Sequence, residues 1–484
     1  MRKIIRLSRR KLFALLFAGI AYPQQSFATI KKNIGDIIRD KNVQGQTTAV
    51  LFDLKTNKIL ESYNKDLKLP LASVTKAVTA VYSIETVGEE YSFSTKLFFD
   101  GKIRQGMLEG DLYLVGGSDP SLSTNDLYKF VEAFNKKGIK RISGDFFYYS
   151  EMIPEFLTID PSQQSQESYN PGFSGLNLDN NRVLFSWLKK ETGYDLKLET
   201  RSKRTKVSAS SISIVGKDHG NTVFEYTVQK KKRLEKWLVI RRILGKKGAR
   251  WLPVRLSSTF TASVLHQLLE KNNIIIPQPK RLRKKVFGMK LLSNHRSERL
   301  SLILKRMLDR STNVTAEIIG VFAANYWGFA TPKISSSGLI MTKWFNYVSK
   351  TNDNLFVNHS GLTDDSRVSG LDFTKFLTRK ETKNILVPLL KEKKIYGHEK
   401  KKIVQADVQV LAKTGTMHFN RGLGGYIMVA GVPFAAFAIF SANIDKKQSI
   451  KRHQLSNPPG SKAWLTRAKN LENTILVNWA LKYI

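Results

Sequence analysis

The chain has 484 residues, 42% of them hydrophobic, and a formal net charge of +39 from 79 basic and 40 acidic side chains. This length exceeds the roughly 250–300 residues at which a single hydrophobic core stops growing, so more than one domain is expected. The absence of cysteine excludes disulfides, thiolate catalysis and Cys-ligated metal, and the seven histidines form no H-E-x-x-H pattern, so we expect neither a metal site nor a cofactor.

The amino terminus has the three parts of a secretory signal peptide, which we assign to residues 1–28. Six basic side chains lie within the first eleven residues, the apolar run Leu12–Ala21 follows, and Ser26-Phe27-Ala28 offers a small-x-small cleavage site. The apolar run is shorter than the roughly 20 residues that span a bilayer. We therefore expect export, to the periplasm or the outer face of the cytoplasmic membrane, with an uncleaved anchor as the alternative.

The segment after the signal predicts the first strands of a sheet. A short helix is expected over Ile30–Lys41, and Thr47–Asp53 and Lys58–Tyr63 read as the two strands of a hairpin. The apolar stretch Val74–Val87 favours a helix that stops at Gly88.

From about residue 89 to 290 the sequence pattern differs from that of the flanking parts of the chain. Short strand-like pieces alternate with turns, as at residues 110–117, and residues 160–175 form a polar loop. Helices are expected at Leu127–Lys137 and Ala262–Lys271. We interpret residues 89–290 as a large, mainly β insertion of one or two subdomains.

The last part of the chain supplies helices and then strands. Helices are expected at Arg299–Leu308 and Val314–Tyr326, and a final helix carries an apolar stripe that indicates core packing. Residues 29–88 and 291–484 together predict one discontinuous catalytic domain, with an antiparallel sheet flanked by helices. The strands expected here are Val408–Leu411, Gly425–Ala430 and Phe434–Ser441.

Three short motifs follow one another along the chain: Ser73-Val74-Thr75-Lys76, Ser311-Thr312-Asn313 and Lys413-Thr414-Gly415-Thr416. They match S-x-x-K, S-x-N and K-T-G, the set used by serine β-lactamases and penicillin-binding proteins. Each motif alone arises readily by chance, so local context has to choose. The same serine patterns also begin at Ser8, Ser62, Ser123, Ser186 and Ser441.

Ser73 has the setting that a nucleophile needs. It follows Pro70 at the start of an expected helix, where free backbone N–H groups favour developing negative charge. Lys76 lies three residues on, on the same helix face, within reach of the hydroxyl. Lys76 can act as the base only when it is neutral, so burial and the positive charge of Lys413 should lower its pKa.

Ser311 and Lys413 complete the set. Ser311 stands in a short turn between two expected helices, whereas Ser123 reads as a helix cap. Lys413 begins the only K-T-G at the end of an expected strand, and Gly415 permits close approach of a substrate to the strand edge. No Ser-His-Asp alternative is visible.

With these motifs the sequence resembles the class C low-molecular-mass penicillin-binding proteins, the D-alanyl-D-alanine carboxypeptidase/endopeptidase family. The gap between Ser73 and Ser311 is more than twice that between Ser311 and Lys413, as in class C. Thr312 and Asn358 depart from the family, which has Asp at both positions. The further stretches similar to family patterns are Gly110–Pro120, Ala316-Glu317, Ser360–Ser369 and Arg421–Tyr426.

The resemblance implies an α/β (α+β) fold of the serine β-lactamase/penicillin-binding transpeptidase type and an acyl-enzyme reaction on peptidoglycan. Ser73 would attack the carbonyl between two D-alanines, or in a cross-link, with Lys76 as the base. Ser311 would relay a proton to the leaving amine and Asn313 would hold the substrate amide. β-Lactams would be covalent inhibitors. The substrate-binding residues implied are Lys413, Thr414, Gly415 and Thr416, and the backbone N–H groups of Ser73 and Thr416 would form the oxyanion hole.

The partner of the basic surface and the competing functions stay open. Nucleic acid is not expected, because no binding motif accompanies the charge and an exported protein rarely meets it. Anionic wall polymer or a membrane surface fits the charge better, beside a solvated surface without a partner. A β-lactamase and a non-catalytic peptidoglycan-binding scaffold are the alternative functions. The sequence ranks neither carboxypeptidase against endopeptidase activity nor the oligomeric states.

Overall fold

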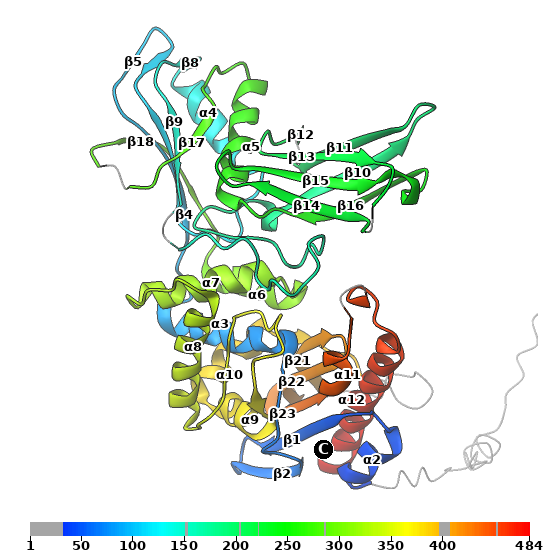
Figure 1. Ribbon diagram of the computed structural model, residues 1–484. Helices are drawn as coiled ribbons and strands as arrows, with labels where there is room; N and C mark the ends of the chain where they lie inside the picture. The colour runs from blue at the N-terminus through cyan, green and yellow to red at the C-terminus, as the bar shows by residue number, and fades with distance from the viewer. Residues whose placement is uncertain are drawn as a thin grey trace, which may run out of the picture.

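The computed structural model has two lobes, one above the other in Figure 1. It describes residues 32–150, 153–202, 205–220, 222–284, 287–395, 407–451 and 454–484. The signal segment predicted for residues 1–28 lies outside the described residues. Within them, no helix combines the length and the apolar character that crossing a membrane requires.

The lower lobe is built on a six-stranded antiparallel sheet with the strand order β2-β1-β23-β22-β21-β20. Its strands come from both ends of the chain, because β1 pairs along its whole length with β23. The predicted antiparallel sheet is thereby confirmed. Its strands are β1 (Gln46–Asp53), β2 (Lys58–Tyr63), β20 (Lys391–Glu392), β21 (Val408–Met417), β22 (Asn420–Val429) and β23 (Val432–Ala442).

Helices cover both faces of this sheet (Figure 1). On one face lie α2 (Ile34–Lys41) and α12 (Ser461–Tyr483), whose residues Leu471, Ile475 and Trp479 are buried against the strands. The predicted carboxyl-terminal stripe is therefore core packing. The other face shares one large apolar core with a layer of helices. These are α3 (Thr75–Val87), α6 (Leu300–Arg310), α7 (Asn313–Tyr326), α8 (Ile334–Ser349), α9 (Gly370–Thr378) and α10 (Lys380–Leu389).

The upper lobe is mainly β. A five-stranded sheet, β17-β9-β7-β4-β18, shares its core with α4 (Tyr128–Lys136) and α5 (Ser257–Lys271). The sheets β12-β11-β10-β16 and β13-β15-β14 extend to the right in Figure 1, and β5-β6-β8 is a small separate sheet. The strands are β4 (Ser94–Phe99), β5 (Lys102–Arg104), β6 (Met107–Glu109), β7 (Leu112–Gly116), β8 (Arg141–Ile142), β9 (Phe146–Tyr149), β10 (Arg182–Lys189), β11 (Tyr194–Arg201), β12 (Lys206–Val207), β13 (Ile212–Lys217), β14 (Phe224–Gln229), β15 (Leu234–Ile240), β16 (Lys247–Pro253), β17 (Pro279–Arg281) and β18 (Lys290–Arg296).

Strand pairing carries the upper lobe a few residues beyond the limit of 290 predicted for the insertion. β18 pairs antiparallel with β4, ending at the pair Arg296 and Ser94. The chain then enters α6 at Leu300 and returns to the lower lobe. The partner strand β4 lies at the other end of the inserted region. A pairing between strands so far apart in the sequence cannot be predicted from the composition around residue 290.

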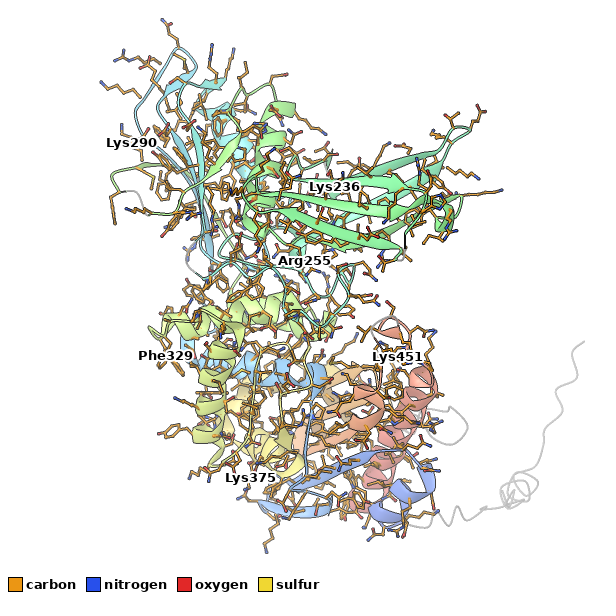
Figure 2. The ribbon with its side chains drawn as sticks, in the orientation of Figure 1. Lys236, Arg255, Lys290, Phe329, Lys375 and Lys451 are labelled. Atoms are coloured by element: carbon orange, nitrogen blue, oxygen red, sulfur yellow. The ribbon has the colours of Figure 1, made fainter. Side chains whose placement is uncertain are left out.

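A long loop, residues 153–178, lies between the lobes and contains the polar stretch predicted at 160–175. Arg255, labelled at this junction in Figure 2, donates hydrogen bonds from its guanidinium to the backbone oxygens of the loop. The loop is thereby tied to the upper lobe. The remaining short elements are β3 (Lys68–Leu69), which pairs with β19 (Val368–Ser369), the 3-10 turns η2 (Asp179–Asn181) and η3 (Arg241–Ile243), and α11 (Ile444–Gln448).

Candidate active site

Ser73 lies in the 3-10 turn η1 (Ala72–Val74), which runs directly into α3. The sequence predicted the helix but not this turn. Ala72 is buried with a positive φ of 47°, a conformation that costs roughly 1–3 kcal/mol and persists only where the surroundings enforce it. Lys76 lies about one helical turn after Ser73, and its Nζ is 2.9 Å from Ser73 Oγ.

Lys76 is fully buried, and its Nζ has three oxygen neighbours. They are Ser73 Oγ at 2.9 Å, Asn313 Oδ1 at 2.8 Å and the Ser360 carbonyl at 2.7 Å. Burial lowers the pKa of Lys76 well below its ordinary value, and the charge of Lys413 lowers it further, as the sequence argument requires. A neutral Lys76 keeps two N–H bonds for Asn313 and Ser360 and turns its lone pair to the Ser73 hydroxyl. A general base needs this arrangement.

Ser311 and Asn313 occupy the tight turn between α6 and α7. Ser311 closes α6 with a positive φ of 56°, and α7 begins at Asn313. Ser311 Oγ accepts a hydrogen bond from Lys413 Nζ at 3.1 Å, while Asn313 Oδ1 accepts from Lys76. This turn therefore brings the second motif to both the first and the third.

Lys413 links β21 to Ser311. Its buried Nζ donates to Ser311 Oγ and to the Thr414 carbonyl at 2.8 Å. Burial lowers the pKa of Lys413 to about 8, and the nearby Arg421 acts in the same direction. Lys413 thus remains a cation near neutral pH and lowers the pKa of its neighbour Lys76 in turn.

The absence of a side chain at Gly415 lets β21 lie against the turn that carries Ser73. A Cβ at this position would stand 2.4 Å from Leu71 O and 3.0 Å from Ser73 N. The sequence predicted a close approach of substrate at Gly415, whereas the side on which a Cβ would stand faces the η1 turn. The close packing is therefore between two protein segments, with Ser73 and Thr416 on its flanks.

β21 offers an open edge beside these residues. β22 pairs with β21 along its length, but on the other side β20 pairs only with Leu411 and Ala412. In the described part of the chain, residues 413–417 have no strand partner on that side. An extended peptide can add to such an edge through main-chain hydrogen bonds.

Glu317 is a buried carboxylate whose role the sequence left unassigned. Its Oε1 accepts from Ser360 N at 2.9 Å and its Oε2 from His359 N at 3.2 Å. Burial raises the pKa of Glu317, while these N–H groups and Lys76 oppose the rise. The carboxylate fixes the loop that presents the Ser360 carbonyl to Lys76. A signal was available, because Glu317 stands four residues after Asn313, on the same face of α7.

The loop around Ser360 is packed against η1. Gly361 has a φ of 72°, and a Cβ there would stand 1.9 Å from Ala72 O. Its N–H donates to the Oδ1 of buried Asn358 at 2.9 Å. Asn358, which stands where the family pattern has Asp, therefore makes a hydrogen bond within this loop.

A buried ion pair ties β22 to the last helix. Arg421 makes a bidentate contact with Glu472 of α12, with both nitrogen–oxygen distances 2.9 Å, and also donates to Thr416 Oγ1. Removing one partner of such a pair typically costs about 3–5 kcal/mol. Arg421 therefore positions Thr416 as well as lowering the pKa of Lys413. The family pattern had singled out Arg421, but nothing in the sequence pointed to Glu472.

The motif side chains open into a cleft of about 870 Å³. Its far wall comes from the upper-lobe loop 153–178, through Asp160 and Tyr169. Asn313 Nδ2 donates to the Tyr169 carbonyl at 3.0 Å, so the loop contacts the second motif directly. Lys76 and Lys413 do not line the cleft and lie behind its surface. The motif residues that line it are Ser73, Ser311, Asn313, Thr414 and Thr416.

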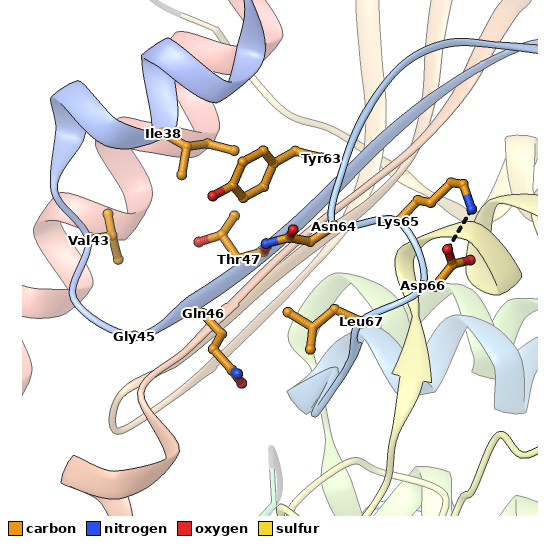
Figure 3. Close-up of a pocket in the computed structure, with 10 residues that line it drawn as sticks. All are labelled: Ile38, Val43, Gly45, Gln46, Thr47, Tyr63, Asn64, Lys65, Asp66 and Leu67. Atoms are coloured by element: carbon orange, nitrogen blue, oxygen red, sulfur yellow. Dashed lines mark hydrogen bonds and ion pairs between the residues drawn. The ribbon is translucent and has the colours of Figure 1, made fainter.

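A smaller hollow of about 410 Å³ lies elsewhere in the lower lobe, between α2, β1 and the chain that follows β2 (Figure 3). Ile38, Thr47 and Tyr63 line it, and Lys65 and Asp66 form an exposed ion pair at its rim. None of the three motifs contributes a residue to this hollow. The chemistry therefore belongs to the cleft.

The other serines that begin the same patterns lie outside the cleft. Ser62 is on β2 and Ser186 is on β10 of the upper lobe. Ser123 precedes α4, where its hydroxyl donates to Asp126 at 2.6 Å. Ser441 is buried on β23. Ser8 lies outside the described residues.

Comparison with known proteins gives the family. The profile of the D-Ala-D-Ala carboxypeptidase 3 (S13) family matches residues 30–457, a range that contains all three motifs. The chain belongs to this family. The D-alanyl-D-alanine carboxypeptidase DacB of Haemophilus influenzae is 29% identical over 127 residues, which are 26% of each chain. The D-alanyl-D-alanine carboxypeptidase of Actinomadura sp. strain R39 is 31% identical over 142 residues, 29% of this chain. This chain spans 26% of the length of each of these two curated relatives.

Solved structures are similar over nearly the whole molecule. Penicillin-binding protein 4 (DacB) of Haemophilus influenzae has a TM-score of 0.69 and 20% identity, covering 92% of this chain and 99% of its own. At this identity the likeness shows the fold alone. The penicillin-binding fold and the family predicted from the motifs are thus confirmed.

Proposed function

We propose that the protein is a serine D-Ala-D-Ala carboxypeptidase or D,D-endopeptidase, which hydrolyses peptidoglycan stem peptides or cross-links through an acyl-enzyme on Ser73. The observation that carries the proposal is the contact of Ser73 Oγ with buried Lys76 Nζ, at 2.9 Å. A nucleophile and a base within hydrogen-bond reach, with the pKa of the base lowered, are what covalent amide hydrolysis requires. Membership of the S13 family supports the same reaction.

In the acylation step, Ser73 Oγ attacks the carbonyl carbon of the penultimate D-alanine while Lys76 accepts the hydroxyl proton. The oxyanion is held by the backbone N–H groups of Ser73 and Thr416, and one such donor is typically worth about 3–4 kcal/mol. The C–N bond then breaks, and the leaving amine takes the proton that Lys76 accepted, relayed through Ser311, which Lys413 holds in place.

The substrate binds along the open edge of β21. The hydroxyls of Thr414 and Thr416 receive the terminal carboxylate, with Thr416 Oγ1 oriented by Arg421, and the charge of Lys413 behind them attracts it. Asn313 Nδ2, which donates to Tyr169 O in the free protein, donates to a substrate carbonyl instead.

Water completes the reaction. It attacks the ester carbonyl on Ser73, the carbonyl–Oγ bond breaks, one water proton passes to Ser73 Oγ, and the shortened peptide loses the other as it leaves as a carboxylate. A β-lactam enters by the same attack, but its leaving nitrogen remains tethered, so the adduct persists. The solved structure of Haemophilus influenzae penicillin-binding protein 4 with a β-lactam has a TM-score of 0.67 to this chain. β-Lactams are therefore the expected covalent inhibitors.

The location that fits this substrate is outside the cytoplasmic membrane, in the periplasm or at the outer face of that membrane. Residues 1–28 are the segment that directs export. The net charge of +39 adds attraction to anionic wall polymer or a membrane surface.

A fluorescent penicillin tests the proposal. Protein lacking residues 1–28 is incubated with the label beside Ser73→Ala, and covalent adduct is read on a denaturing gel. We expect label on the parent and none on Ser73→Ala, because the ester forms only on that oxygen. Ser62→Ala, which removes an S-x-x-K serine outside the cleft, is the matched control and should label like the parent.

The outcomes separate the alternatives. No label on folded parent, with the penicillin left intact, would sink the enzyme proposal and favour a non-catalytic scaffold. Rapid destruction of the penicillin would favour a β-lactamase. If label forms, digestion of cross-linked muropeptides distinguishes carboxypeptidase activity, which releases D-alanine, from endopeptidase activity, which removes cross-links.

A further inference from the structure

A second cavity, of about 560 Å³, lies behind the turn that carries the S-x-N motif. Thr312 and Thr315 line this cavity, whereas Ser311 and Asn313 line the cleft, so one turn of chain separates the two sites. Its walls come from both lobes: β18 and the start of α4 above, and α6 and the amino terminus of α7 below. The size is that of cavities that hold small organic ligands, roughly 300–1,000 Å³.

Positive charge gathers in this cavity. Among its lining residues five are basic and two, Asp126 and Glu298, are acidic. Arg296 from the upper lobe and Arg310 from the lower lobe are both exposed, and among the described residues neither forms an ion pair. The basic residues are Lys129, Arg182, Arg296, Arg306 and Arg310.

The contacts of the other cations leave the cavity electropositive. Arg306 is paired with Glu298, and Lys129 contacts His295 Nδ1 at 3.3 Å. The buried Nε of Arg182 has no hydrogen-bond acceptor in the part of the chain that the structure describes. At the amino terminus of α7, the side chain of Thr312 caps no backbone N–H, so the partial positive charge of this helix end adds to that of the side chains.

We propose that this cavity binds an oligoanion, a ligand with two or more phosphate or carboxylate groups. Arginine matches either group with two parallel hydrogen bonds, and Arg296 and Arg310 reach the ligand from opposite lobes. The site lies outside the catalytic cleft and takes no part in the reaction proposed for Ser73. Phosphates of an anionic polymer and carboxylates of a peptidoglycan stem are two sources of the same chemistry.

Isothermal titration with the catalytic cleft already filled tests this site. The parent is first acylated with penicillin, and Ser73→Ala is titrated beside it without penicillin, so a failure of acylation leaves the measurement intact. The probes are tripolyphosphate, inorganic phosphate at equal ionic strength, and the tripeptide L-alanyl-γ-D-glutamyl-diaminopimelate, in about 0.1 M salt to screen distant charges. We expect tripolyphosphate to bind saturably at one site and to raise the unfolding temperature.

Paired variants decide whether the cavity is the site. Arg296→Gln with Arg310→Gln should weaken tripolyphosphate binding at least about tenfold, because each removes charge-assisted hydrogen bonds. The control, Lys236→Gln with Arg242→Gln, removes the same charge from exposed positions of the upper lobe, where Figure 2 labels Lys236, and should bind like the parent.

Each outcome has a defined meaning. Tighter binding of the tripeptide than of tripolyphosphate identifies the stem carboxylates as the source, and the reverse order identifies phosphate. Binding without saturation, or equal weakening in the two double variants, would overturn the proposal and attribute the affinity to the overall charge. Absence of binding by any probe would also overturn it.

Discussion

Two buried lysines in the candidate site both have a lowered pKa, and burial is the main cause for each. Lys76 has its pKa lowered well below the ordinary value, chiefly by burial, and is therefore available as a neutral base. Lys413 has a pKa of about 8 and keeps its proton at neutral pH, ready for a substrate carboxylate. The charge of Lys413 in turn favours the neutral form of Lys76, so one residue prepares the other.

A bell-shaped pH dependence follows for acylation by penicillin. The second-order rate constant should rise as Lys76 loses its proton, well below pH 10.5, and fall above about pH 8 as Lys413 loses the charge that holds the carboxylate. In Lys413→Arg only the falling limb should move to higher pH, because arginine stays protonated to above about pH 12. Both profiles can be measured by stopped-flow acylation. A rate that is constant from about pH 6 to 10 would contradict Lys76 as the base.

At the scale of elements, the hydrophobic periodicity predicted those helices and strands whose limits are set by nearby residues. The hairpin β1–β2 and the buried stripe of α12 came out as expected. The start of α5 did not: the helix begins at Ser257 and not at Ala262, directly after Arg255 and Leu256, whose backbone N–H groups donate to Glu235 on β15. A contact with a distant strand, such as this one with Glu235, leaves no mark in the sequence around the helix.

The candidate site was predictable to a similar extent. The motifs identified the residues that meet in the cleft, since each sits at a turn or strand end that sequence can recognise. Glu317 and Glu472 escaped, because each acts by holding another group: the Ser360 loop in one case and Arg421 in the other. The role of Glu472 becomes visible only when the elements are packed together, whereas the spacing of Glu317 from Asn313 on α7 was a signal that the sequence already carried.

The contact of β21 with η1 gives a second prediction. In Gly415→Ala the new methyl group meets Leu71 O, so β21 must move away from Ser73 and displace an oxyanion donor. Acylation by penicillin should then fall at least about a hundredfold, the usual effect of losing one donor. Gly245→Ala is the matched control, because a Cβ there meets nothing within 4 Å. Rates and thermal unfolding are measured together, and a folded Gly415→Ala that acylates at the parental rate would contradict this role.

For the whole molecule, the inserted lobe supplies part of the cleft that the lower lobe lacks. Loop 153–178 contributes Asp160 and Tyr169 to the far wall, and its position depends on Arg255. Across the mouth of the cleft, Ser456 Oγ donates to Gln164 Oε1 of the same loop at 2.5 Å. The loop is thus held between the lobes from both sides.

Replacing Arg255 should distinguish the contribution of loop 153–178 to substrate binding from the reaction at Ser73. Arg255 is 5% exposed and donates to the carbonyls of Leu157, at 3.3 Å, and Ser165, at 2.6 Å. In Arg255→Met these partly buried acceptors and the buried Asn170 carbonyl lose their donor, at roughly 1–3 kcal/mol for the buried one, and the far wall of the cleft loosens. The KM for a stem peptide, which is long enough to reach that wall, should rise about tenfold, a change worth about 1.4 kcal/mol.

Acylation of Arg255→Met by a small penicillin, which needs only the lower-lobe residues, should change little. Arg241→Met removes a partly exposed arginine that pairs with Asp218 in the upper lobe, and should leave the kinetics with both substrates unaffected. Equal losses with peptide and penicillin would mean that Arg255 supports the fold as a whole. Unchanged kinetics with both would mean that the loop keeps its place without it. Only a loss confined to the peptide shows that the inserted lobe exists in part to recognise the length of the substrate.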